Sequence, residues 1–304
     1  GYMESLHFAH QHATVGGWDA SRLQYARFRV FATGDFMAPD ELRGESMMEV
    51  QRRDDLARWY AHSIMQTHFM MDGETEGESV AGDGSASSDR VGGDRAWVLS
   101  QLATLYRIDL PIRRLRRDPG VSVAAMKSFL SIDDVQLTAN PTDESLTELC
   151  LAGCEVTSAA LATIPPQPDL RWLDLSRLPI GVDDASRIVL DPGTLQQLNL
   201  EATRIDATVA DWLRGASRLT ELDLSWTKVD DRLAAVIPKM PALRTLWLTG
   251  SKVGDRTAAA VQRLSQLEAV DLQRTEVSND GLRSLRSAGG QLQINPLQLR
   301  AATP

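Results

Sequence analysis

One leucine pattern recurs through the second half of the chain and limits what the chain can fold into. Its central positions lie 24 residues apart, with one step of 25, at Leu149, Leu173, Leu198, Leu222, Leu246 and Val270. Each of these residues has a Leu three positions before it and another Leu two positions after it. Six units held in phase in this way predict a repeat architecture.

Two further positions follow each leucine triplet and keep their chemistry from unit to unit. The first is mostly a small or polar residue, at Cys154, Leu178, Thr203, Thr227, Ser251 and Thr275. The second is always β-branched, at Val156, Ile180, Ile205, Val229, Val253 and Val277. The pattern L-x-x-L-x-L-x-x-[T/S/C]-x-[I/V] resembles the leucine-rich repeat family, and the unit length is similar to its cysteine-containing and ribonuclease-inhibitor-like subclasses.

The resemblance covers roughly half of the chain and implies an α/β fold. The implied architecture is a right-handed leucine-rich repeat solenoid, a horseshoe or arc with a parallel sheet on its concave face, and it implies binding to another macromolecule. Alternation within each strand sends the leucines inward and the residues between them outward. The small residue after the strand is expected to serve unpaired backbone amides of the turn, and Asp206, Asp230, Asp255 and Asp280 are expected to cap the short helices.

Changes in composition divide the chain into five segments. Apolar residues at helical spacing after Pro39 predict one long or two shorter helices ending near Met71, whereas residues 72–94 are rich in Gly, Ser and acidic residues. A degenerate first repeat at 121–145, with strand positions at 122, 125 and 127, is expected to cap the array. The predicted segments are a mainly helical region at 1–71, a linker at 72–94, a helix with the N-terminal cap at 95–145, six repeats at 146–290, and a terminal strand with a tail at 291–304.

No catalytic or metal-binding residue is predicted. His7 and His10 would share a helix face, but His12 would not, and no Cys or acidic pair completes a metal site. Cys154 is expected to pack inside the array, and Cys150 is expected to lie on the exposed sheet face without a neighbouring base. The sequence therefore indicates no enzyme and no cofactor.

The net charge of −9 argues against a nucleic-acid partner. The five arginines within residues 107–118 are interpreted as a solvated face or a salt-bridged cap. No apolar run is long enough to insert into a membrane. The first residue is Gly rather than Met, which suggests a trimmed or processed chain, so the loss of an upstream targeting segment and the localisation stay open. The oligomeric state also stays open.

The outward strand positions and the turns form columns that are candidates for binding a protein or peptide. The predicted partner-binding residues are Trp172, Asp174, Asn199, Arg204, Glu221, Asp223, Trp226, Lys228, Trp247, Lys252 and Asp271. Exposed aromatics beside charged residues are typical of protein-binding surfaces. We therefore expect a non-catalytic interaction module that uses its concave face. Two alternatives stay open: the tryptophans pack against the N-terminal helices, or the repeats select substrates for an enzyme or metal-dependent factor in the N-terminal region.

Overall fold

The computed structural model describes residues 7–9, 12–14, 21–38, 41–42, 47–72, 123–139, 146–288 and 292–295. The chain forms two compact units, one of residues 1–30 and 34–131, the other of residues 31–33 and 132–304. Several predicted features lie outside the described residues: the linker beyond residue 72, the helix expected after residue 95, the arginines of 107–118, His10 and the tail after residue 295.

The first unit is mainly helical. Its helices are α1 (Ser21–Arg27), which continues into the π-helical turn η2 (Phe28–Ala32), α3 (Met47–Val50), α4 (Leu56–Asp72) and α6 (Val123–Leu130). Of the predicted apolar residues between Pro39 and Met71, Met48 lies in α3 and those from Leu56 onward lie in α4, whereas Leu42 precedes both helices. This outcome is one of the two that their spacing allows.

The core of this unit forms where α1 packs against α4 and α6. Leu23, Met65 and Phe69 are almost completely buried there. The rings of Phe69 and Phe129 meet edge to face at 5.6 Å. The buried Arg27 donates a 2.8 Å hydrogen bond from Nε to the carbonyl of Leu130, which satisfies part of a guanidinium inside the core.

The histidine-rich start also belongs to the first unit. Strands β1 (His7–Ala9) and β2 (His12–Thr14) pair antiparallel, with His7 opposite Thr14. The expectation that His7 lies on a helix is therefore wrong, because the backbone groups of this segment pair with a second strand and not along a helix.

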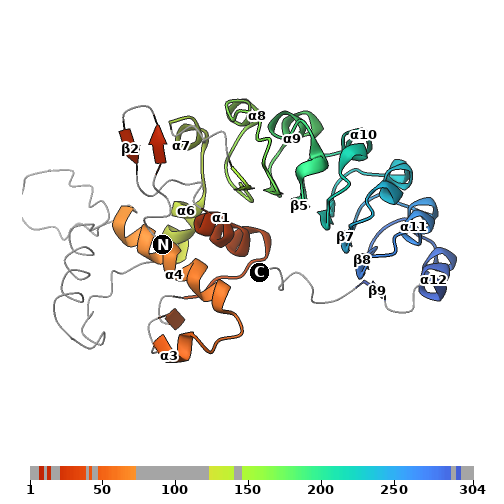
Figure 1. Ribbon diagram of the computed structural model, residues 1–304, viewed down its shortest axis with the longest axis horizontal. Coiled ribbons are helices and arrows are strands. Elements are labelled where there is room, and N and C mark those ends of the chain that lie inside the picture. Colours follow the sequence, from red (N-terminus) through yellow and green to blue (C-terminus); the bar gives the residue numbers. More distant parts are fainter. Residues whose placement is uncertain are drawn as a thin grey trace, which may run out of the picture. The chain divides into compact units, whose positions relative to one another are not determined.

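The second unit is built on a parallel sheet of seven strands in sequential order (Figure 1). The strands are β3 (Glu148–Cys150), β4 (Trp172–Asp174), β5 (Gln197–Asn199), β6 (Glu221–Asp223), β7 (Thr245–Trp247), β8 (Ala269–Asp271) and β9 (Gln293–Ile294). Equivalent repeat positions pair directly, so Leu149 lies opposite Leu173 and Leu222 opposite Leu246. The leucines are fully buried and fix this register.

Short helices connect the strands and lie on the outer side of the array, while the strands line its concave side (Figure 1). The α-helices are α7 (Asp134–Ala139), α8 (Ser158–Leu161), α9 (Val182–Ile188), α10 (Val209–Trp212), α11 (Asp255–Val261) and α12 (Asn279–Ala288). The 3-10 turns are η4 (Pro192–Thr194), η5 (Leu213–Gly215), η6 (Asp231–Ala235) and η7 (Ile237–Lys239). Stacking wide helices on closely spaced strands curves the array toward the sheet.

The start of the array differs from the degenerate repeat that the sequence suggested. Residues 123–130 form helix α6 and not a strand, because Ala125 and Lys127 stand where leucines would anchor a strand. The repeat geometry begins at Ile132, whose carbonyl accepts a 2.9 Å hydrogen bond from the amide of Glu155, and α7 packs on α8. The cap is therefore half of a repeat.

The hydroxyl groups that follow the strands act differently from expectation. Thr203, Thr227 and Ser251 donate hydrogen bonds of 2.6 to 2.7 Å to the carbonyls of Leu200, Leu224 and Leu248. The prediction that they serve backbone amides is wrong, because the groups facing them are carbonyl acceptors. Each bond satisfies a buried carbonyl inside the array.

The aspartates expected at the helix starts take different roles. Asp230 accepts from the amide of Arg232 at 2.9 Å and caps η6, as expected. Asp206 accepts from the amide of Thr208 at 2.9 Å in the turn before α10, and the N-cap of that helix is Thr208. Asp255 accepts from the amide of Ser278 in the next unit, at 2.9 Å, and Asp280 pairs with Arg283 at 2.7 Å within its own helix. The capping prediction is therefore wrong for Asp206, Asp255 and Asp280.

Candidate interaction surface on the repeat sheet

The outward column at the end of each strand has a structural role that the sequence did not reveal. In four units an Asp or Asn accepts the amide of the residue two positions later. These bonds run from Ser176 to Asp174 (2.9 Å), Glu201 to Asn199 (3.0 Å), Ser225 to Asp223 (2.8 Å) and Gln273 to Asp271 (2.9 Å). One side-chain oxygen of each residue therefore stabilises the turn.

Asp174 and Cys150, at the first end of the sheet, are completely buried. The Asp174 carboxylate also accepts a 3.0 Å hydrogen bond from the Asn199 amide, yet burial raises its pKa from 3.8 to about 6. The expectation that these two side chains lie exposed is wrong, because strand alternation gives the direction of a side chain and not what covers it. Phe31, which groups with the repeat unit, lies against Gly153 in the turn after β3.

The later strands present their acidic residues differently. Glu221 and Asp223 on β6 are half-buried, and Asp271 on β8 is 8% exposed. Burial raises the pKa of Glu221, and a hydrogen bond with Gln197 opposes this only in part. The acidic residues of β6 therefore border solvent, whereas Asp271 is buried, and the expectation that its side chain lies exposed is wrong.

Trp247 interrupts the Asp and Asn column. It lies on β7 between Asp223 and Asp271, in register with both, and it is half-buried. Its indole cannot accept the amide two positions later, so the turn gains nothing from an aromatic residue here. Trp172 on β4 is also half-buried and lies opposite Gln197. The structure thus keeps both tryptophans on the sheet face, on either side of the Asn199 strand.

The turn after each strand requires a left-handed backbone. The residue two positions after the last inward leucine has a φ between 55° and 69° in all six units: Gly153, Arg177, Ala202, Trp226, Gly250 and Arg274. A non-glycine residue in this conformation costs about 1 kcal/mol, and a bulky one is uncommon there. The backbone therefore gives no reason for Trp226.

The surroundings of Trp226 are shaped to hold its ring. A Cβ at Gly250 would lie 2.4 Å from the Trp226 Cε3 atom, so only glycine fits beneath the indole. The guanidinium of Arg274 lies 5.4 Å from the ring centroid, in the range of a cation–π contact. Trp226 nevertheless remains 46% exposed. The result is a rigidly positioned aromatic surface at the edge of the sheet.

The basic column forms a separate strip. Arg204, Lys228 and Lys252 are exposed, and their amides donate to the carbonyls of Ile180, Ile205 and Val229 at 2.8 to 2.9 Å. These hydrogen bonds form a second ladder, one residue after the inward Thr or Ser in each unit. The basic side chains therefore lie apart from the predicted acidic residues, which are on the strands.

Comparisons with known proteins find similar solved structures. No protein-family model matches the chain, and no curated protein matches it significantly. An internalin of Listeria monocytogenes is similar, with 15% identity over 50% of this chain and 48% of that chain and a TM-score of 0.37. A leucine-rich repeat protein of Leptospira interrogans has 17% identity over 50% of this chain and 37% of that chain, with a TM-score of 0.33. The chain thus spans less than half of either protein.

A further likeness is to internalin C2 of Listeria monocytogenes, with 15% identity over 54% of this chain and 84% of that chain and a TM-score of 0.21. The decisive observation is the register of the sheet. Residues that pair across neighbouring strands are separated in the sequence by the same spacing as the leucine pattern. The array is a leucine-rich repeat solenoid.

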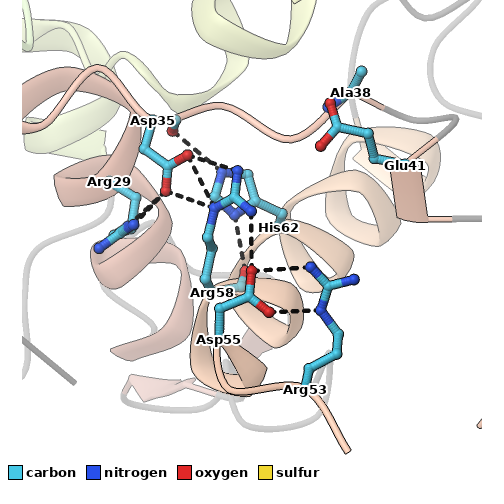
Figure 2. Close-up of polar contacts among 8 residues, drawn as sticks. All are labelled: Arg29, Asp35, Ala38, Glu41, Arg53, Asp55, Arg58 and His62. Carbon is cyan, nitrogen blue, oxygen red and sulfur yellow. Dashed lines mark hydrogen bonds and ion pairs between the residues drawn. The ribbon is translucent and has the colours of Figure 1, made fainter. Parts of the chain in front are cut away.

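A second group of charged side chains lies in the helical unit (Figure 2). Asp35 accepts hydrogen bonds from Arg58 at 2.8 to 3.0 Å and from Arg29. Asp55 accepts from Arg53 at 2.6 and 2.9 Å and from Arg58 at 3.0 Å. Each carboxylate is therefore paired, and Arg58 joins the two.

These contacts and burial shift the pKa values of the titratable residues in this network. Burial raises the pKa of Asp35, but the hydrogen bonds from Arg58 and Arg29 outweigh it, so that the pKa lies below 3.8. The hydrogen bond from Arg53 is the main reason that the pKa of Asp55 falls to about 2. Burial lowers the pKa of His62, whose Nδ1 and Nε2 lie 2.9 and 3.3 Å from the carbonyls of Arg58 and Asp35. The network fastens the segment around Asp35 to α4.

Within the described part of the chain, no three His, Cys, Asp or Glu side chains are arranged to hold a metal ion. Among the same residues, no helix has both the length and the apolar character needed to cross a membrane.

The sequence reasoning missed two features of the surface. The left-handed backbone at the turn position was missed because only two of the six units, those with Gly153 and Gly250, have glycine there. The occurrence of both glycines at the same repeat position is the signal that would have revealed it. The role of Gly250 beneath Trp226 was missed because it depends on a contact between neighbouring units.

Proposed function

We propose that this protein is a non-catalytic interaction module that binds a protein or peptide through the concave face of its leucine-rich repeat array. Trp226 carries the proposal. Its backbone is strained, its ring is seated on Gly250 and beside Arg274, and it is still 46% exposed. Strained residues that the fold does not require are characteristic of functional sites, and tryptophan is the residue most enriched in binding hot spots.

The half-buried Trp247 and Trp172 extend this surface onto the sheet. Of the predicted partner-binding residues, Asp174 is the least suited to direct contact, because it is completely buried. The proposed surface therefore centres on strands β5 to β8. Arg204, Lys228 and Lys252 form its separate basic edge.

Selection of a random peptide library on the immobilised intact protein tests the proposal. The selected peptides are then titrated against Trp226→Ala, a substitution with a precedent at the same turn position in Ala202, whose φ is 55° compared with 57° at Trp226. We expect binding to weaken about 30-fold, as for a hot-spot residue worth about 2 kcal/mol.

Leu190→Ala is the matched control, because Leu190 is 71% exposed and follows helix α9 on the outer side of the array. It should leave binding unchanged. Peptides that bind both variants as tightly as the original protein would contradict the proposal.

A further inference from the structure

The charge of the sheet face has one sign. Among the outward residues of strands β3 to β9, none is Lys, Arg or His, and the acidic residues are Glu148, Asp174, Glu221, Asp223 and Asp271. Positively and negatively charged side chains are ordinarily interspersed on the surface of a folded protein. A face of a single sign favours a partner of the opposite sign and suppresses others.

The strongest concentration of suitable groups surrounds Trp247. Asp223 and Asp271 lie beside it on the two neighbouring strands, in register, so their backbones are about 10 Å apart across the sheet. In both residues one oxygen is engaged by the turn amide.

Hydroxyl groups complete the surroundings along the strand direction. Thr245 lies two residues before Trp247 and on the same face of β7, Thr249 lies in the turn two residues after Trp247, and Ser225 lies two residues after Asp223. Ser225 is completely buried. Within the described part of the chain, the hydroxyl oxygens of all three are shielded from water and make no hydrogen bond. Buried polar atoms without partners are uncommon and cost free energy, so their grouping beside Trp247 marks this stretch of the sheet as one that folding alone does not explain.

We propose that the bound segment is basic, and that one of its Lys or Arg side chains lies against the Trp247 ring between the Asp223 and Asp271 carboxylates. The inference rests on the proposed function and names the chemistry of its partner. An indole attracts a cation through its π face, and two flanking carboxylates neutralise the charge. A nucleic acid or an acidic peptide would meet repulsion at the same place.

Fluorescence anisotropy with labelled synthetic peptides tests the inference. Three peptides of one length and backbone carry Lys, Gln or Glu at every third position, and a fourth carries Arg. The Lys or Arg peptide should bind the intact protein, and it should lose affinity as salt is added. The Gln peptide should bind at least tenfold more weakly, and the Glu peptide should not bind.

The substitutions introduce a residue that another repeat already has at the same position. Asp223→Asn and Asp271→Asn keep the oxygen that accepts the turn amide, as Asn199 does in the neighbouring unit. The double variant should bind the basic peptide about tenfold more weakly, which corresponds to the sum of two ordinary charge pairs. Asp280→Asn removes the same charge from the exposed start of α12 and should change binding less than twofold. Far-UV circular dichroism confirms that each variant is folded.

The possible outcomes separate this inference from the proposed function. Library peptides that require Trp226 but are neutral or acidic would overturn the inference and leave the proposed function in place. The inference is also overturned if neither basic peptide binds, or if Asp280→Asn weakens binding as much as the double variant. Library peptides that do not require Trp226 would remove the function on which it rests.

Discussion

The paired aspartates of the helical unit and the acidic residues on the repeat sheet differ in how the fold affects their charge. In the helical unit, Asp35 and Asp55 are each held by arginines, and both have a lowered pKa (Figure 2). On the repeat sheet, Asp174 and Glu221 lie among polar neighbours, and burial raises the pKa of both. A lowered pKa means that the fold stabilises the charge, whereas a raised pKa means that the fold works against it.

The difference separates acidic residues that stabilise the fold from acidic residues that we propose to take part in binding. Pairing Asp35 with Arg29 and Arg58 leaves it little capacity to interact with anything else. Glu221 has only Gln197 as a partner that affects its pKa, so a cation from outside would relieve the unfavourable charge. The repeat sheet is therefore the better candidate for binding, and the same type of substitution should have opposite effects in the two units.

Asp35→Asn should have the largest effect on stability. It removes the negative charge that Arg29 and Arg58 share, and the side chain of Arg29 is only 8% exposed, so the lost ion pair is a largely buried one. We expect the free energy of unfolding to fall by about 3 kcal/mol, the lower end of what breaking a buried pair costs. Urea titration followed by far-UV circular dichroism measures the change.

The pH dependence of the Asp35 contribution has a definite sign. Because the folded pKa lies below 3.8, the contribution is present above that value and is lost as the pH falls through the folded pKa. Glu41→Gln is the control, since exposed Glu41 only accepts a 3.3 Å hydrogen bond from the amide of Ala38. It should cost less than about 0.5 kcal/mol. Equal effects of the two substitutions would show that the network does not stabilise the fold.

Asp174→Asn should change how stability depends on pH. The folded pKa of Asp174 is about 6 and its ordinary value is 3.8, so between these values the folded state binds more protons than the unfolded state. Stability should therefore fall as the pH rises from about 4 to about 6, by about 3 kcal/mol in total from this one group. Above pH 6 its contribution should be constant.

Unfolding of the intact protein and the variant at about pH 4 and about pH 7 measures this contribution, with hydrogen exchange reporting on the sheet. The difference between the two proteins isolates Asp174 from the other carboxylates. A variant with the same pH dependence as the intact protein would show that Asp174 is not buried in solution.

The strand register was predictable because it depends on a pattern that each unit carries in full. Inward leucines fix the phase of every strand, and the structure confirms both the parallel sheet and the solenoid. The terminal strand at Gln293–Ile294 was also expected. These features follow from local alternation and from the burial of apolar side chains.

The surface was less predictable because it depends on contacts between units and on what covers a side chain. Alternation placed Cys150 and Asp174 on the outward face but did not reveal that they are buried. The carbonyl partner of Thr227 was missed because a hydroxyl can donate as well as accept. The positive φ of Trp226 was missed because its side chain gives no sign of it. The partner-binding role of the sheet residues remains a prediction.

Glu221→Gln should have the smallest effect on stability, and its sign distinguishes the two units. The substitution removes a half-buried charge without an ionic partner and inserts the residue that the previous strand carries at the paired position, Gln197. Burying an unpaired charge costs free energy, so the free energy of unfolding at neutral pH should rise by about 0.5 kcal/mol, whereas Asp35→Asn lowers it. The neighbours of Glu221 are Gln197 on β5, Thr245 on β7 and Asp223 on its own strand, and none of them supplies a positive charge. Urea titration at neutral pH decides the sign, and a loss of stability similar to that of Asp35→Asn would mean that Glu221 serves the fold and is not available to a cationic partner.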